Sequence, residues 1–411
     1  MSTPVTDMLE GLKKDRVMFA MPGHKGRLDL TDITEIDGAD NLLHPSGCIM
    51  ESQKMAARLN SAAHAMYSTN GSSACTSAMI GYFGRGAKVI AARDFHISAK
   101  NAMELYGTRP VYVGLKDMCK PVRTEEIVQA IEEHPDAVGV YVTSPNYYGR
   151  CADLTALAAL CRRRGMLLAV DGAHGAHHPF SPLLPVSPGE AGADLWCASC
   201  HKTLPAKNQA AVLFCGDRVD ERRLKRRLAA VHTTSPSYPI LISIEQAYDE
   251  MEQEGTAMTE KQQAMIGRFL EKIDGLPGIA AEQTDDFTRI VLNVSGRGLT
   301  GFEAERHLSG AGIYAEAADE DRLILISTVA DREADFARLA GALKELPQAG
   351  GRGGRAVYAL EKGEAGEPSW EQTVFAYPPG VPIVLKGQRR TEKQERMIAQ
   401  MRNKGYNLLE W

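Results

Sequence analysis

The sequence lacks a long hydrophobic run and a large excess of either charge. No run of about 18 apolar residues occurs, so no membrane-spanning helix is evident. The first residues also contain no apolar stretch of signal-peptide length. The net charge is −5, with 47 basic and 52 acidic residues mixed along the chain, whereas nucleic-acid binding relies on a basic surface. We therefore expect a cytoplasmic protein that binds neither nucleic acid nor a membrane.

Cysteine is sparse as well. Eight cysteines in 411 residues are too few for a disulfide scaffold, which fits a compartment where thiols stay reduced. No internal repeat is visible, which argues against a solenoid. Because the chain is longer than a single hydrophobic core usually grows, it has room for more than one domain and for a buried active site.

Six short apolar or β-branched runs alternate with helical patterns in the first half of the chain. They are "AKVIAA" (87–92), "RPVYVGL" (109–115), "AVGVYVT" (137–143), "GMLLAV" (165–170), "DLWCA" (194–198) and "AAVLFC" (210–215). Continuous apolar runs of this kind are typical of buried, mostly parallel strands, which predicts an α/β sandwich. Polar loops follow four of the runs, and ligands bind beyond the carboxyl ends of parallel strands. We expect these loops to converge on one crevice.

A different pattern follows the helical stretch 242–273. Apolar runs at 288–294 and 322–328 alternate with helical patterns at 301–308 and 332–346, which predicts a smaller α+β domain. We divide the chain into an N-terminal arm (1–45), a large domain (46–255) and a small C-terminal α+β domain (256–411).

The stretch "WCASCHKTLPA" (196–206) holds two cysteines, a histidine and a lysine. A zinc site needs four ligands, but no second CxxC exists, and only His174, His177 and His178 are available to complete the set. A redox pair needs an exposed first cysteine at a helix start, whereas Cys197 lies in an apolar run. We interpret Cys197 and Cys200 as ordinary strand and loop residues and predict no metal.

Lys202 in the same stretch directly follows a predicted buried strand. Burial disfavours the charged form of a lysine and lowers its pKa, which makes the amine a competent nucleophile for a Schiff base. The alternative is a surface lysine without a catalytic role.

Three other loops carry residues that could bind a ligand together with Lys202. Gly71, Ser72 and Ser73 precede an apolar helical run, where free N–H groups and hydroxyls suit a phosphate, although a simple serine cap is the alternative. Asp171 ends a core strand and needs a cationic partner there, such as a pyridinium nitrogen, unless it only caps the next turn. His96 follows another strand, and its ring either stacks on a planar cofactor or is structural.

One motif points elsewhere. "GRGLTG" (296–301) matches the dinucleotide-binding GxGxxG pattern, with Glu316 about 20 residues further on. The sequence after it has room for only one βαβ unit, and the loops suited to phosphate lie in the other domain. We interpret it as a tight strand-to-helix turn.

Nine motifs together resemble, in order, those of the ornithine/lysine/arginine decarboxylases. They are "MPGHKG" (21–26), "DITEIDGADNLLHPSG" (32–47), "NGSSA" (70–74), "RDFHISAKNAMEL" (93–105), "SPNYYG" (144–149), "DGAHGAHHPF" (171–180), "SCHKTLPA" (199–206), "TSPSYPILISIEQA" (234–247) and "YPPGVPIVLKGQ" (377–388). The resemblance covers nearly the whole chain. It implies a pyridoxal-phosphate enzyme of the aspartate-aminotransferase fold (fold type I), with a mostly parallel seven-stranded sheet. Because "PGHKG" begins at residue 22, the chain resembles the short form without a wing domain.

The resemblance also implies roles for individual residues. Lys202 would hold pyridoxal 5'-phosphate covalently, Asp171 would pair with its ring nitrogen, His96 would stack on the ring, and His174 would lie near the ring oxygen. Ser72, Ser73, Ser199 and His201 would bind the phosphate or lie close to it, and His201 or Lys202 would return a proton to the product. Thr234 and Ser235 would reach the phosphate of a neighbouring subunit, which implies a homodimer or larger homo-oligomer with shared active sites.

The implied activity is decarboxylation of arginine, lysine or ornithine, which releases CO2 and a polyamine-type amine. Two acidic positions of the family pattern are missing, because Gly172 and Gln388 stand where glutamates are usual. Ala376 likewise replaces a proline. A pyridoxal-phosphate aminotransferase or lyase, and a non-catalytic relative, are therefore the alternatives.

Overall fold

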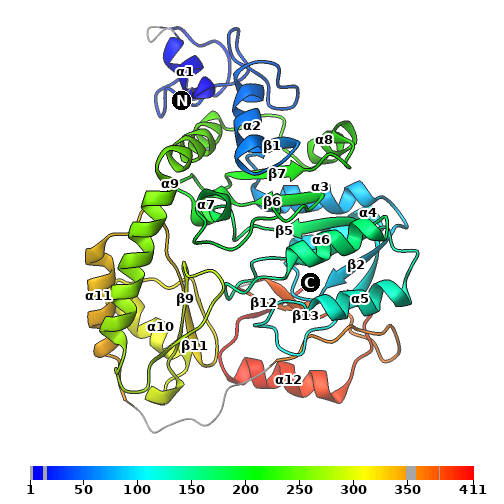
Figure 1. Cartoon of the computed structure of the whole chain (residues 1–411), viewed down its shortest axis with the longest axis vertical. Coiled ribbons are helices and arrows are strands. Elements are labelled where there is room, and N and C mark those ends of the chain that lie inside the picture. The colour runs from blue at the N-terminus through cyan, green and yellow to red at the C-terminus, as the bar shows by residue number, and fades with distance from the viewer. Residues whose placement is uncertain (1–2, 13–15, 349–357, 379) are drawn as a thin grey trace.

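A seven-stranded sheet forms the centre of the protein (Figure 1). The computed structural model describes residues 3–12, 16–348, 358–378 and 380–411. The strand order is β1-β7-β6-β5-β4-β2-β3. The strands are β1 (His64–Ser68), β2 (Lys88–Ala92), β3 (Arg109–Val113), β4 (Gly139–Thr143), β5 (Leu167–Asp171), β6 (Leu195–Ala198) and β7 (Ala211–Cys215). Neighbours from β3 to β6 are parallel, whereas β7 is antiparallel to both β6 and β1. The predicted α/β class and mostly parallel sheet are confirmed.

The six apolar runs correspond to β2 through β7. Strand β1, "HAMYS", was not predicted, because its polar ends and short length give no apolar run. It pairs with β7 at the edge of the sheet.

Helices cover both faces of this sheet. One face packs against α3 (Gly71–Phe83), α4 (Ile97–Tyr106) and α8 (Glu221–Ala229), and the other packs against α2 (Cys48–Leu59), α5 (Thr124–Glu133), α6 (Leu154–Arg163) and the start of α9 (Tyr238–Ile273). Successive strand residues alternate between the two cores: Ala169 of β5 joins the first, and Leu168 and Val170 join the second. Burial on both faces explains why the strands read as continuous apolar runs.

A second, antiparallel sheet has the order β10-β11-β9-β8 and its own apolar core. It consists of β8 (Ala280–Glu282), β9 (Arg289–Asn293), β10 (Ala317–Ala318) and β11 (Arg322–Ile326), with α10 (Gly301–Gly310), α11 (Glu333–Lys344) and the end of α9 against it. The GRGLTG segment is a tight turn, as predicted. It forms a 3-10 turn at Ser295–Arg297, and Thr300 and Glu303 then form a capping box at the start of α10.

The C-terminal part forms a third sheet, β13-β12-β14, which packs back onto the first. Its elements are β12 (Val374–Ala376), β13 (Val381–Val384), α12 (Glu392–Asn403) and β14 (Leu408–Glu410). The buried Arg93, just after β2, donates from Nε to the Glu361 carbonyl at 3.0 Å and from Nη2 to the Ile383 carbonyl at 3.1 Å. The proposed domain division at residues 45 and 255 stays a prediction.

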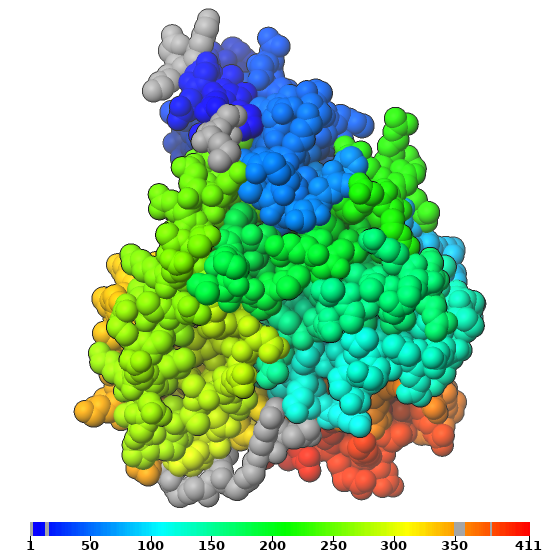
Figure 2. All heavy atoms as spheres, viewed as in Figure 1, coloured from blue at the N-terminus to red at the C-terminus, as the bar shows by residue number. Residues whose placement is uncertain are grey.

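The N-terminal helix α1 (Pro4–Gly11) packs against α2 and α9. Both carboxylate oxygens of Glu245 accept backbone N–H groups of this segment, from Val5 and Thr6, at 2.9 Å. The N-terminal and C-terminal parts lie at opposite ends of the long axis (Figure 2). Within the described ranges, no helix is both long and apolar enough to cross a membrane.

Candidate active site

A cavity of about 460 Å³ opens at the carboxyl ends of the parallel strands. The four loops that were expected to converge all line it, and each contributes a polar side chain: His96, Asn146, His174 and Lys202. The start of α3 and Tyr377 of the C-terminal part complete the wall. The crevice predicted from strand polarity is therefore present.

Lys202 lies in α7 (Cys200–Thr203), the single helical turn that follows β6. Burial lowers the pKa of its amine, although the Asp171 and Glu316 charges act in the opposite direction. Its Nζ lies 3.1 Å from Nε2 of His174. The lysine is thus held inside the cavity, as the sequence predicted.

The second ring nitrogen of His174, Nδ1, indicates which atom donates in the contact between His174 and Lys202. Nδ1 lies 3.1 Å from Nη2 of Arg289, and a guanidinium can only donate, so Nδ1 must accept. Burial, followed by the Lys202 and Arg289 charges, lowers the pKa of His174 well below its ordinary value. A neutral ring that accepts at Nδ1 carries its proton on Nε2. Nε2 therefore points its proton toward Lys202 Nζ, a hydrogen bond that the neutral form of the amine can accept.

Asp171 ends β5 on the same side of the sheet. Its carboxylate accepts the Tyr141 hydroxyl at 3.1 Å and the Ala173 N–H at 3.2 Å. The side chain is buried and lines the cavity. A buried carboxylate at this position suits a cationic ligand group, because a charge of opposite sign offsets the cost of burying it.

The first turn of α3 faces the cavity through Gly71, Ser72 and Ser73. Its N-cap residue, Asn70, makes no capping hydrogen bond with its side chain, so the first N–H groups of the helix have no helical partner. Ser199 Oγ donates to Ser72 Oγ at 2.7 Å. These hydroxyls and N–H groups form a ready anion site.

His96 is the N-cap of α4, and its Nδ1 accepts the Ser98 N–H at 3.1 Å. Burial lowers the pKa of the ring. The backbone of Gly380 lies against the ring so closely that a Cβ there would be 2.8 Å from His96 Nε2. The Gly380 carbonyl also accepts the Ile97 N–H at 2.7 Å.

The remaining predicted residues are less central. His201 lines the cavity, and its Nδ1 lies 3.0 Å from the Ala210 carbonyl, which fixes the ring. Thr234 and Ser235 are exposed and do not line the cavity. They follow Thr233, whose N–H donates to Asn70 Oδ1 at 3.4 Å, so this segment lies beside the start of α3. Their predicted role toward a neighbouring subunit stays a prediction.

The two cysteines of the CxxC are not part of a metal set among the described residues. Both are fully buried, and burial raises their pKa values. Cys197 Sγ lies 3.5 Å from Asp171 Oδ1 and 3.8 Å from Thr76 Oγ1. The interpretation as ordinary strand and loop residues agrees with this packing.

The two positions that lack a family glutamate lie in different places. A Cβ on Gly172 would be 2.8 Å from the Cys197 carbonyl oxygen, so the backbone leaves no room for a side chain. Gln388 is buried away from the Lys202 cavity, and its Oε1 accepts the Leu385 N–H at 3.0 Å.

Three residues at the site were not singled out from the sequence. Asp94 lines the cavity with both carboxylate oxygens lacking a hydrogen-bond partner, and burial raises its pKa to about 7. Arg289 is buried with Nε and Nη1 unpartnered. Glu316, considered only as part of the dinucleotide pattern, accepts the hydroxyl of the cavity residue Tyr147 at 2.8 Å.

Comparison with known proteins agrees with this geometry. A family described as "Orn/Lys/Arg decarboxylase, major domain" matches residues 27–283. An arginine decarboxylase of Bacillus subtilis is 29% identical, with 96% of this chain and 93% of the relative covered. An arginine decarboxylase of Bacillus cereus is 30% identical, with 84% and 82% covered.

Solved structures show the same fold. The constitutive lysine decarboxylase of Escherichia coli superimposes with a TM-score of 0.81 at 15% identity, which covers 99% of this chain and 80% of that one. The predicted fold of pyridoxal-phosphate enzymes is therefore confirmed.

Proposed function

Because the chain belongs to the Orn/Lys/Arg decarboxylase family of pyridoxal-phosphate-dependent amino-acid decarboxylases, we propose that it removes CO2 from arginine, with lysine and ornithine as the other candidates. The product would be a polyamine-type amine. The observation that carries the proposal is the buried Lys202, which lies in one cavity with the Asp171 carboxylate and whose pKa is lowered by burial. The preference for arginine rests on the relatives that are named arginine decarboxylases.

The residues present fit pyridoxal phosphate. The uncapped start of α3, with Ser72, Ser73 and Ser199, suits the phosphate. Asp171 suits the ring nitrogen, because this carboxylate is buried, lines the cavity and makes no ion pair among the described residues. Lys202 would hold the cofactor covalently, and His96 would contact its ring. When bound, the cofactor supplies an electron sink for the pair released as CO2 leaves.

Side chains of the protein determine which atoms of the site carry protons. The Nε2–H of His174 points at Lys202 Nζ and favours the neutral amine, whose lone pair must leave this hydrogen bond before it reacts. When it is not attached to the cofactor, Lys202 in its protonated form would be positioned as a proton donor to the α-carbon of the substrate. His201 is the other candidate donor, but its Nδ1 is engaged with the Ala210 carbonyl.

Glu316 is our candidate for recognition of the distal cation of the substrate. Its carboxylate is held by the Tyr147 hydroxyl at 2.8 Å, and Tyr147 lines the cavity. A charge-assisted hydrogen bond from a guanidinium or ammonium to this carboxylate would favour basic amino acids. The Glu316 charge also acts on the pKa of Lys202, which supports a position within reach of a long substrate.

We also propose that two copies of the chain share their active sites. Thr234 and Ser235 lie exposed beside the start of α3, where a neighbouring subunit would bring a second pair of hydroxyls. Sedimentation of the Thr234→Ala/Ser235→Ala variant and the parent chain, together with their affinity for pyridoxal phosphate, tests this proposal. A monomeric parent chain with full cofactor affinity would overturn it.

The deciding experiment is to load the chain with pyridoxal phosphate, incubate it separately with arginine, lysine and ornithine, and measure CO2 and amine release. Release from one substrate establishes the reaction and names the substrate. An aminotransferase is the second candidate, because Gly172 stands next to Asp171 where the family pattern has a glutamate. An α-keto acid without CO2 would favour that reaction and overturn the decarboxylase proposal.

A further inference from the structure

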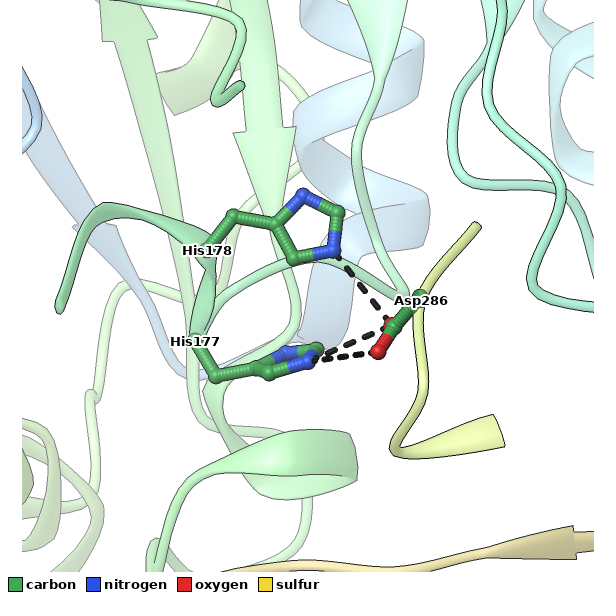
Figure 3. A group of neighbouring side chains, drawn as sticks. All are labelled: His177, His178 and Asp286. Carbon is green, nitrogen blue, oxygen red and sulfur yellow. Dashed lines mark hydrogen bonds and ion pairs between the residues drawn. The ribbon is translucent and has the colours of Figure 1, made fainter. Parts of the chain in front are cut away.

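A second cluster of titratable side chains lies outside the cavity. His177 and His178 follow β5, with His178 opening the 3-10 turn His178–Phe180, and Asp286 precedes β9 of the second sheet. The three side chains are buried, and their polar atoms converge on one point (Figure 3). The cluster therefore joins two segments that are more than 100 residues apart in the sequence.

The two His–Asp distances within the cluster match those between ligands of one metal ion. His177 Nε2 lies 3.2 Å and His178 Nε2 lies 3.3 Å from Asp286 Oδ2, and all three ligand atoms lie within 4.8 Å of one another. Ligands at about 2.0–2.1 Å from a tetrahedral zinc ion are about 3.3 Å apart. Charge-assisted hydrogen bonds are usually shorter, at about 2.7–2.9 Å. The two His–Asp distances thus suit a shared ion, and the most separated ligand atoms, within 4.8 Å of one another, would have to close to about 4.2 Å or less on binding.

A fourth oxygen lies close by. Thr288 Oγ1 is 3.1 Å from His177 Nε2 and donates to Asp286 Oδ1 at 2.7 Å. The Thr288 N–H also donates to Asp286 Oδ1, at 3.0 Å. Asp286 Oδ1 is thereby held by the chain, and Oδ2 faces both imidazoles. Such outer contacts orient a carboxylate ligand.

We propose that His177, His178 and Asp286 bind one zinc ion, with the Thr288 hydroxyl or a water at the fourth position. Zinc accepts two imidazoles and one carboxylate, whereas magnesium prefers oxygen ligands and disfavours the two imidazoles. The ion connects the loop after β5 to the start of β9. The site is separate from the Lys202 cavity, and its role is structural.

The test uses the full chain, before and after it is loaded with pyridoxal phosphate. After dialysis against a chelator, the chain is titrated with zinc chloride, and bound metal is counted by atomic emission. We expect one zinc ion per chain and a higher thermal unfolding midpoint, because a ligand that binds only the folded state stabilises it. Magnesium should produce neither effect.

Two variants, His177→Gln and His178→Gln, should each lose the bound zinc and the rise in midpoint. His64→Gln is the matched control, because His64 also pairs with a carboxylate, Glu221 at 3.4 Å, but outside the cluster. Circular dichroism without metal confirms that the variants fold. No zinc on the parent chain, or equal zinc on the His178→Gln variant, would show that the cluster is held by hydrogen bonds alone and overturn the proposal.

Discussion

The ring of His174 connects Lys202 to Arg289, with one nitrogen 3.1 Å from Lys202 Nζ and the other 3.1 Å from Arg289 Nη2. Since the guanidinium can only donate, it fixes the proton of the ring on the side of the lysine. Burial is the main cause that lowers the pKa of the proposed nucleophile, and Arg289, a residue of the second sheet, contributes to the same lowering. This relationship underlies the first two predictions.

Replacing Lys202 with alanine should abolish covalent attachment of pyridoxal phosphate and lower decarboxylation by at least ~10³-fold, as expected for loss of a catalytic nucleophile. Borohydride reduction followed by mass spectrometry of the peptide that contains residue 202 measures the attachment. Circular dichroism should show an unchanged fold. Cofactor trapped on another lysine of the parent chain would refute the assignment.

Covalent attachment should depend on pH in a way that Arg289 controls. The neutral amine is the reactive form, and burial lowers the pKa of Lys202 from the ordinary 10.5, so attachment should be half-maximal below pH 10.5. The Arg289 charge contributes to this lowering. In the Arg289→Met variant the half-point should therefore move to higher pH, whereas Arg289→Lys should restore part of the shift. The initial rate of borohydride-trapped attachment against pH gives both values, and an unmoved half-point in Arg289→Met would contradict the coupling.

The Asp171→Asn variant should still attach the cofactor to Lys202 but lose decarboxylation by ~10²–10⁴-fold. A neutral amide no longer stabilises a protonated ring nitrogen, which the electron sink requires. The reduced peptide and CO2 release are measured on the same preparation. If CO2 release stays at the level of the parent chain, Asp171 is only the cap of its turn.

Glu316→Gln should raise the KM for the preferred basic amino acid by roughly 10-fold and leave kcat nearly unchanged. This corresponds to the loss of one charge-assisted hydrogen bond outside the reacting bonds. Glu271→Gln, on an exposed position of α9, is the matched control and should have no effect. A fall in kcat with constant KM would place Glu316 in the chemical step instead.

Alanine substitutions at two glycines should have opposite effects on the free energy of unfolding. A Cβ on Gly139 of β4 would lie 2.3 Å from the Phe83 ring and 2.9 Å from the Leu167 carbonyl oxygen, so Gly139→Ala should destabilise the fold by ~1–3 kcal/mol. Gly267 in α9 has nothing within 4 Å of such an atom, so Gly267→Ala should stabilise it by ~0.5–1 kcal/mol. Urea unfolding of both variants gives the free energies, and a neutral Gly139→Ala would mean that Phe83 moves aside.

The sequence predicts those site residues that directly follow a strand. Lys202, Asp171 and His96 stand next to apolar runs, and the rule for parallel sheets brings their loops together. Asp94 lies in one of the same loops, but only the neighbouring His96 was singled out from the sequence there. Its unpartnered oxygens are visible only when the packing around it is known.

Arg289 and Glu316 were beyond the reach of sequence patterns. They lie in or next to the second sheet, and no pattern in the sequence predicts that one end of this sheet lies beside the cavity. The edge strand β1 was missed for a related reason. Its short polar sequence acquires its conformation from pairing with β7, not from its own residues.

The contact between Gly380 and His96 also determines when the cavity can form during synthesis. The wall around His96 includes Gly380 and Tyr377, and the buried Arg93 bonds to carbonyls at 361 and 383. The seven-stranded sheet can assemble while the ribosome is still adding the last segment. Until the final strands have emerged from the ribosome, one side of the cavity is missing. The nascent chain therefore cannot bind its ligand as the complete chain does.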